Sequence, residues 1–171
     1  MIKRLVKGKV FVFIDAANIF YAQRTLKWRI SYERLMNYLS SECNLGKCFV
    51  YTATLKENKK QARFIRMLKK AGYIVRTKPV KMIRLSRNSF QWKGNFDVEL
   101  TIDVLDNLSN FSTLILLSGD SDFAHLLRRV KKERKRVIVV SAKKHISREL
   151  LLEAKFVNFK NLKEKIELKE K

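Results

Sequence analysis

A buried strand and a tight acidic turn follow one another in Leu114-Ile115-Leu116-Leu117-Ser118-Gly119-Asp120-Ser121-Asp122-Phe123. The four apolar residues at the start have the length and composition of a buried strand. The segment 123–130 at the other end carries an apolar stripe that predicts a helix. A glycine and two carboxylates therefore lie between a strand and a helix, at the edge of an open α/β sheet where ligands bind.

An ordinary helix cap is the alternative interpretation of this turn. Ser121 or Asp122 would then accept hydrogen bonds from free backbone N–H groups at the start of the helix. A cap accounts for one acidic residue well and for two less well. The stretch alone leaves both interpretations open. Asp122 can contribute to a helix cap even if the turn is a functional site.

The rest of the chain repeats this strand-to-helix pattern. Strands are expected at residues 9–14, 47–53, 73–77, 113–117, 136–141 and 156–159, and helices at 31–41, 59–71, 96–108, 123–130 and 147–154. Such alternation predicts an α/β fold, a single-domain sandwich with a mostly parallel central sheet and helices on both faces. We expect one domain over residues 1–159, followed by a charged tail, 160–171, that forms a frayed or surface helix.

Residues 80–92 interrupt the pattern with a basic hairpin. Two β-prone runs, 80–85 and 89–92, flank Ser86-Arg87-Asn88. The mixture of cations and aromatic side chains suits a phosphate backbone with stacked bases, although an amphipathic hairpin with its aromatic residues on the core explains it equally well. The residues of this region that we expect to bind nucleic acid are Lys81, Arg84, Arg87, Trp92 and Lys93.

The chain carries a large excess of positive charge. Its 171 residues include 38 Lys and Arg against 16 Asp and Glu, a net charge of +22. A field of this size attracts polyanions, so nucleic acid is the first partner to consider, and a merely basic, solvated surface is the alternative. Outside the hairpin, we expect four further cations to contact phosphates: Arg63, Arg66, Arg128 and Lys132.

Composition also bears on membrane association and on the cellular compartment of the protein. The chain is 46% hydrophobic, which is enough for a core, but it has no apolar stretch long enough to span a bilayer, so no membrane partner is expected. Cys43 and Cys48 are too few for a disulfide scaffold and lack the spacing of a zinc site. Two reduced thiols predict a cytoplasmic protein.

Three groups of acidic residues stand out in this basic chain. Asp15 follows the first strand, Asp97, Glu99 and Asp103 lie on one predicted helix, and Asp120 and Asp122 lie in the turn. If the strands before Asp15 and Asp120 are neighbours, these carboxylates face one crevice and repel one another unless a cation lies among them. All-oxygen ligands favour Mg²⁺ or Mn²⁺. An acidic centre inside a basic rim is what a metal-dependent nuclease needs.

Three motifs carry a family resemblance. They are Ile14-Asp15-Ala16-Ala17-Asn18, Lys93-Gly94-Asn95-Phe96-Asp97 with Asp103 in the helix after it, and Ser118-Gly119-Asp120-Ser121-Asp122-Phe123. In order and spacing they resemble the motifs of the NYN domain, a family also called LabA-like that belongs with the PIN-like nucleases. The resemblance implies a Rossmann-like (PIN-like) sheet with an acidic site at the carboxyl ends of its strands. It also implies divalent-metal-dependent cleavage of RNA.

The same resemblance implies roles for individual residues. By position, Asp15, Asp97, Asp120 and Asp122 would be catalytic acids that ligate the metal. Asn18 would orient a ligand or substrate.

Asp103 would be an accessory acid of the site. A residue six positions past Asp97 on a helix, however, turns well away from the same face. An ion pair between Asp103 and a nearby Lys or Arg is therefore an equal alternative.

The leading hypothesis is a ribonuclease that uses Mg²⁺ or Mn²⁺ to activate water for attack on phosphorus. We expect it to be an endonuclease. Its partner would be single-stranded or structured RNA, and a homodimer is a further possibility. The alternative is a nucleic-acid-binding module that keeps the fold without useful catalysis. Binding without cleavage under any divalent metal would favour that alternative.

Overall fold

The central sheet has six strands, and every neighbouring pair is parallel. The computed structural model describes residues 1–55, 57–84 and 90–169, with the backbone alone for residues 81–84 and 90–93. The strand order is β3-β2-β1-β6-β7-β8. The strands are β1 (Lys9–Asp15), β2 (Asn44–Thr54), β3 (Ile74–Pro79), β6 (Thr113–Leu117), β7 (Arg136–Ser141) and β8 (Lys155–Asn158). The predicted α/β fold with a parallel sheet is confirmed.

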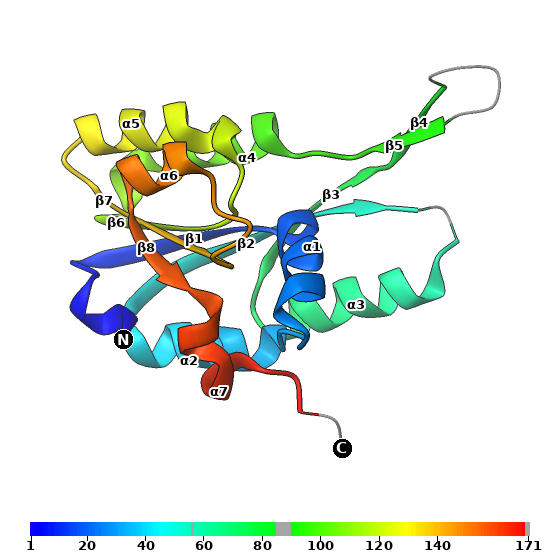
Figure 1. Ribbon diagram of the computed structural model, residues 1–171, viewed down its shortest axis with the longest axis horizontal. Helices are drawn as coiled ribbons and strands as arrows, with labels where there is room; N and C mark the ends of the chain where they lie inside the picture. The colour runs from blue at the N-terminus through cyan, green and yellow to red at the C-terminus, as the bar shows by residue number, and fades with distance from the viewer. Residues whose placement is uncertain (56, 85–89, 170–171) are drawn as a thin grey trace.

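Helices cover both faces of this sheet (Figure 1). One face carries α1 (Ala16–Leu26), α2 (Tyr32–Glu42), α3 (Lys59–Lys70) and the single turn α7 (Lys163–Ile166), and the other carries α4 (Asp97–Asp106), α5 (Ala124–Lys132) and α6 (Arg148–Glu153). Short 3₁₀ turns lie at η1 (Ile2–Arg4), η2 (Leu108–Asn110), η3 (Ser121–Phe123) and η4 (Phe159–Leu162). The predicted helices agree with these bounds to within a few residues.

The two faces of the sheet build two hydrophobic cores. Along β1, Val10, Val12 and Ile14 pack toward α1 and α2, whereas Phe11 and Phe13 pack toward α4 and α5. Successive side chains of a strand point to opposite faces, so a strand covered on both sides needs apolar residues at every position. This requirement explains why β1 and β6 are continuous apolar runs in the sequence.

β1 and β6 are neighbours, and they mark the point where the strand order reverses. Ile14 pairs with Leu117 in the parallel register. From β1 the chain first builds β2 and β3 on one side, then crosses back to build β6, β7 and β8 on the other. Such a reversal leaves a crevice at the carboxyl ends of the two strands, where ligands of open α/β sheets bind. The residues that follow Ile14 and Leu117 therefore meet in that crevice.

A two-stranded hairpin projects from this carboxyl edge between β3 and α4 (Figure 1). β4 (Lys81–Arg84) pairs antiparallel with β5 (Phe90–Lys93), so the predicted hairpin is confirmed for its strands. Arg87, one of the expected nucleic-acid contacts, lies outside the described residues. The same holds for the side chains of the other four, Lys81, Arg84, Trp92 and Lys93.

The C-terminal tail differs from the expected frayed or surface helix. Leu162 and Ile166 are buried in the core on the α1 and α2 face. The backbone N–H of Ser31 donates to the carbonyl oxygen of Ile166 at 2.8 Å, and the Arg34 guanidinium donates to the carbonyl of Glu167 at 2.9 Å. The expectation was wrong because alternating Lys and Glu dominate the composition of the tail, whereas two apolar residues four positions apart decide its packing.

Two smaller expectations concern the cysteines and membrane-spanning segments. Cys43 and Cys48 are both free thiols. Within the described part of the chain, the helices are all too short or too polar to cross a bilayer.

Candidate metal centre

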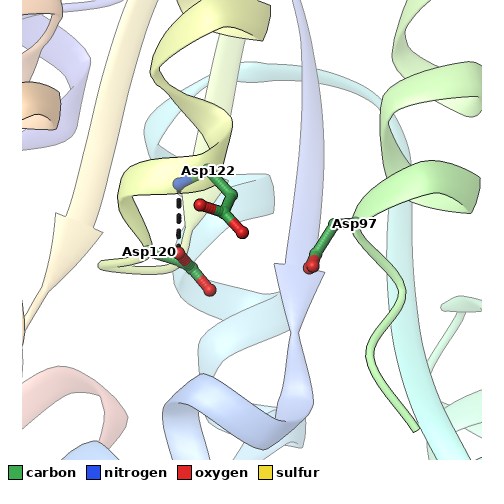
Figure 2. A group of neighbouring side chains, drawn as sticks. All are labelled: Asp97, Asp120 and Asp122. Atoms are coloured by element: carbon green, nitrogen blue, oxygen red, sulfur yellow. Dashed lines mark hydrogen bonds between the residues drawn. The ribbon is translucent and has the colours of Figure 1, made fainter.

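Three carboxylates gather at the crevice between β1 and β6. Each of Asp97, Asp120 and Asp122 offers an oxygen, and these atoms all lie within 4.8 Å of one another. Figure 2 shows Asp120 and Asp122 on one side of the end of β1 and Asp97 on the other. Asp97 is the first residue of α4, and the other two lie in the turn between β6 and α5. Two segments of the fold, the turn after β6 and the start of α4, thus build one acidic cluster beside the end of β1.

The turn after β6 orients Asp120 by a hydrogen bond within the turn itself. Asp120 is the cap of the 3₁₀ turn η3, and its Oδ1 accepts from the backbone N–H of Asp122 at 3.0 Å (Figure 2). The capping alternative proposed for Ser121 or Asp122 was therefore placed on the wrong residue. One side chain performs both tasks, since the cap uses one oxygen of Asp120 and fixes the direction of the carboxylate.

Asp15 plays the matching part at the end of β1. Its Oδ1 caps α1 by accepting from the backbone N–H of Asn18 at 3.1 Å, and its Oδ2 accepts from the Ser118 hydroxyl at 3.3 Å. The Asn18 side chain then accepts from the backbone N–H of Gly119 at 3.0 Å. Asp15 and Asn18 thus join the turn after β1 to the turn after β6 and fix the position of Asp120.

Gly119 lets a third segment close over this turn. A Cβ at this position would lie 1.6 Å from the backbone oxygen of His145, which no side chain could tolerate. The Gly119 carbonyl accepts from the backbone N–H of Ser147 at 3.0 Å. The glycine of the motif is therefore required by the close approach of the segment between β7 and α6.

The electrostatics of the cluster indicate uncompensated negative charge. Partial burial raises the pKa of Asp97, and the negative charges of Asp120 and Asp122 raise it further. The Asn95 amide, which donates to Asp97 Oδ2 at 2.7 Å, acts in the opposite direction. Burial also raises the pKa of Asp15, against the hydrogen bond from Asn18, and the charge of Asp97 adds to the rise. A cation among these groups would relieve both effects.

Two of the expected acids lie outside the group of three. Asp15 is held behind it by Asn18 and Ser118, close enough for charge interaction with Asp97. Asp103 is bound by Arg76, whose Nε and Nη2 each donate to one carboxylate oxygen at 2.9 Å. The Tyr51 hydroxyl donates to the same carboxylate at 2.8 Å. Asp103 therefore has the geometry of the ion-paired alternative.

The cations expected to bind phosphates have different surroundings. Arg63 and Arg66 are exposed on α3. Arg128 pairs with Glu153 at 2.8 Å. Lys132 is exposed at the last residue of α5, a helix that begins beside the acidic turn and leads away from it to the start of β7. Of these four, only Arg128 has an acidic partner among the described ion pairs.

Sequence reasoning missed two residues next to the cluster. Lys78, near the carboxyl end of β3, lies 2.6 Å from Glu99 and partly offsets the negative charge around Asp97. Asn95 supplies the amide that binds Asp97. The rule that located Asp15, a polar residue at the carboxyl end of a parallel strand, also applies to Lys78. Asn95 gave no such signal, because its contact depends on how the chain enters α4.

A parallel sheet with an acidic cluster at its strand-order reversal places this protein among Rossmann-like α/β proteins with a PIN-like nuclease fold. The chain belongs to the NYN-domain family, whose model matches residues 9–161. It is 32% identical over 147 residues to the low amplitude and bright protein LabA of Synechococcus elongatus, covering 84% of this chain and 78% of LabA. It also resembles the crystal structure of VPA0982, a protein of unknown function from Vibrio parahaemolyticus, with a TM-score of 0.79 and 25% identity. That match covers 95% of this chain and 97% of the other. These matches confirm the family resemblance drawn from the three motifs.

Proposed function

We propose that this protein is a divalent-metal-dependent ribonuclease that cuts RNA internally. The observation that carries the proposal is the uncompensated cluster of Asp97, Asp120 and Asp122 on a chain with a net charge of +22. Acids are scarce in this sequence, yet three converge at the crevice that open α/β sheets use for ligands. Membership of the NYN family supports the same activity.

The donor set suits Mg²⁺ or Mn²⁺. All three side chains offer carboxylate oxygens, and hard divalent cations prefer oxygen ligands. The group includes neither a cysteine nor a histidine, the ligands typical of zinc. The raised pKa of Asp97 reflects the repulsion that such a cation would remove.

In the proposed reaction, Asp97, Asp120 and Asp122 hold the cation, and Asp15 contributes negative charge behind them. A bound divalent cation supplies Lewis-acid stabilisation of the phosphoryl oxygens and a more acidic water. Asn18 and Ser118 are positioning residues, because they bind Gly119 and Asp15 and so keep the two turns in register.

Cations around the crevice would hold the RNA backbone. We assign this role first to Arg63 and Arg66, because both are exposed and, within residues 1–55, 57–84 and 90–169, neither forms an ion pair as Arg128 does. The strands of the hairpin, β4 and β5, leave the sheet at the same edge as the acids, and we propose that RNA also contacts the hairpin. Each phosphate neutralised releases counterions, so binding should weaken steeply as salt rises.

The test is cleavage of a fluorescently labelled single-stranded RNA with Mn²⁺, with Mg²⁺ and with EDTA. We expect cleavage by the wild type with metal and none with EDTA or in Asp120→Asn. The matched control is Asp106→Asn, the same change at an exposed acid on α4, which should retain activity. Equal cleavage by the wild type and Asp120→Asn would refute the site. Salt-sensitive binding without cleavage under either metal would favour the binding module instead.

A further inference from the structure

A large apolar groove lies on the α1 and α3 side of the sheet. It has a volume of about 860 Å³, within the range of small-molecule sites. Four aromatic residues contribute to its lining, Phe20, Tyr21, Tyr32 and Phe64. The acidic cluster does not use this groove, and its size exceeds what a packing defect in a close-packed protein would leave.

The groove begins next to Asp15, the acid that lies behind the cluster. Ala16 and Ala17, the first residues of α1, line it, and they directly follow Asp15. Thr52 and Ala53 also line it, from the carboxyl end of β2, the strand that neighbours β1. A ligand that reached the cluster could therefore place an adjoining part in the groove.

Two exposed aromatic rings stand at this groove. Phe20 and Tyr21 are 54% and 56% exposed, so both rings are accessible to a ligand. Their rings meet edge to face with centroids 5.6 Å apart. The Arg24 guanidinium lies 5.0 Å from the Phe20 centroid and 5.4 Å from that of Tyr21. Exposed aromatic rings beside an arginine are the usual platform for stacking an unpaired base next to its phosphate.

Ordered amide groups complete the lining. The Gln23 side-chain oxygen accepts from the backbone N–H of Ile30 at 2.6 Å, and the Asn58 oxygen accepts from that of Gln61 at 3.0 Å. These bonds fix both amides through their oxygens. Across the part of the chain that the structure describes, the amide nitrogens of Gln23 and Asn58 make no hydrogen bond. They are placed to donate to the acceptors on a base edge.

We propose that this groove binds an unstacked base of the RNA, with Phe20 and Tyr21 as the stacking platform and Arg24 beside the adjoining phosphate. The inference rests on the proposed function, because it takes RNA as the substrate of the acidic cluster. It adds which kind of RNA the protein binds. A paired base must leave its stack to enter the groove, so the protein should prefer single-stranded or looped RNA over duplex. An apolar protein segment would fit the groove by shape, but the charge of the chain and Arg24 favour a polyanion.

Binding without cleavage is the direct test of the base site. Fluorescence anisotropy in EDTA would compare a single-stranded RNA with the same backbone carrying abasic sites. We expect the wild type to bind the intact RNA at least about tenfold more tightly, and Phe20→Ala/Tyr21→Ala to lose that preference, because stacking on aromatic residues supplies this order of affinity. The matched control is Val98→Ala/Leu152→Ala, which truncates two residues exposed by 68% and 74% outside the groove and should bind as the wild type does.

The outcomes separate this inference from the ribonuclease. Equal affinity of the wild type for intact and abasic RNA, or an unchanged preference in the aromatic double variant, would overturn the base site even if the protein cleaves RNA. A base preference in a protein that never cleaves would sustain the base site and refute the ribonuclease. The dye bis-ANS gives a second measurement. If intact RNA fails to displace dye that the aromatic double variant no longer binds, RNA does not enter the groove and the base site is wrong.

Discussion

Asp97 and Asp103 lie on the same helix, α4, and have opposite surroundings. Asp97 begins the helix and faces Asp120 and Asp122, with oxygens of all three within 4.8 Å of one another. Asp103 faces Arg76, which donates two hydrogen bonds of 2.9 Å to its carboxylate. The carboxylate of Asp97 can therefore still bind a cation, whereas the carboxylate of Asp103 is already paired with Arg76.

Asp97 and Asp103 differ in whether a neighbouring cation compensates their charge, and this property indicates which acids of a basic protein are functional. An acid paired by an arginine fork gains stability from its charge and needs nothing further. An acid beside other acids raises the free energy of the folded state, and such perturbed groups concentrate at functional sites. Charge compensation, more than position on a shared helix, therefore separates Asp97 from Asp103.

The largest expected effect is on cleavage. Asp97→Asn removes one charged oxygen ligand and should lower the rate of RNA cleavage with Mn²⁺ by more than about 100-fold, since even the outer partners of metal ligands are worth 10- to 100-fold. Asp103→Asn keeps an oxygen for the Tyr51 hydroxyl and lies outside the group, so its rate should change little. The measurement is the single-turnover rate on labelled RNA at saturating protein. A comparable loss in both variants would remove the distinction and return Asp103 to the site as an accessory acid.

Much of the fold and the centre of the site were predictable from the sequence. Continuous apolar runs such as residues 10–14 require cover on both faces, and their alternation with helices predicts a parallel sheet. Asp15 and Asp120 were expected to converge if the strands before them are neighbours, and the structure pairs β1 with β6. The strand-end rule therefore indicated which edge of the sheet carries the site.

The remaining features depend on contacts between segments distant in the chain. The pairing of Asp103 with Arg76 requires α4 to cross β3, and no local pattern encodes that crossing. The burial of Ile166 requires the tail to return to α2, although its composition is that of a solvated helix. The aromatic groove likewise combines α1 and α3, whose sequences show only separate apolar positions.

A smaller effect is expected on stability from the paired acid. Asp103→Ala removes the acceptor of the Tyr51 hydroxyl, on a side chain that is only 1% exposed, and leaves Arg76 without its partner. An unsatisfied buried hydroxyl costs about 1–3 kcal/mol, so the free energy of unfolding should fall by about that amount. Urea unfolding followed by circular dichroism measures it. Asp106→Ala, at an exposed acid of the same helix, serves as the control and should stay close to the wild type.

The smallest effect is expected at Asp97 in the absence of metal. Asp97→Asn removes a partly buried charge that two neighbouring carboxylates repel, while its amide oxygen can still accept from Asn95. In EDTA at neutral pH the variant should therefore be more stable than the wild type, by about 0.5–1 kcal/mol, the usual gain from relieving unfavourable charge at a functional site. Thermal unfolding with EDTA and with Mg²⁺ measures the difference. Added Mg²⁺ should stabilise the wild type and leave the variant nearly unchanged.

The difference in stability between the wild type and Asp97→Asn in EDTA should also depend on pH. The pKa of Asp97 lies above its ordinary value of 3.8 in the folded protein, so between those two pKa values the folded state binds more protons than the unfolded state. Over this window the metal-free wild type gains stability as the pH falls, and Asp97→Asn lacks that contribution. The advantage of the variant should therefore shrink as the solution is acidified toward pH 4. Carboxylates distant from Asp97 cancel in the comparison, because both proteins share them. Asp15 contributes in the same direction as Asp97, since the charge of Asp97 raises its pKa. An advantage that stayed constant with pH, or a variant less stable than the wild type in EDTA, would mean that the charge of Asp97 is compensated within the fold as that of Asp103 is.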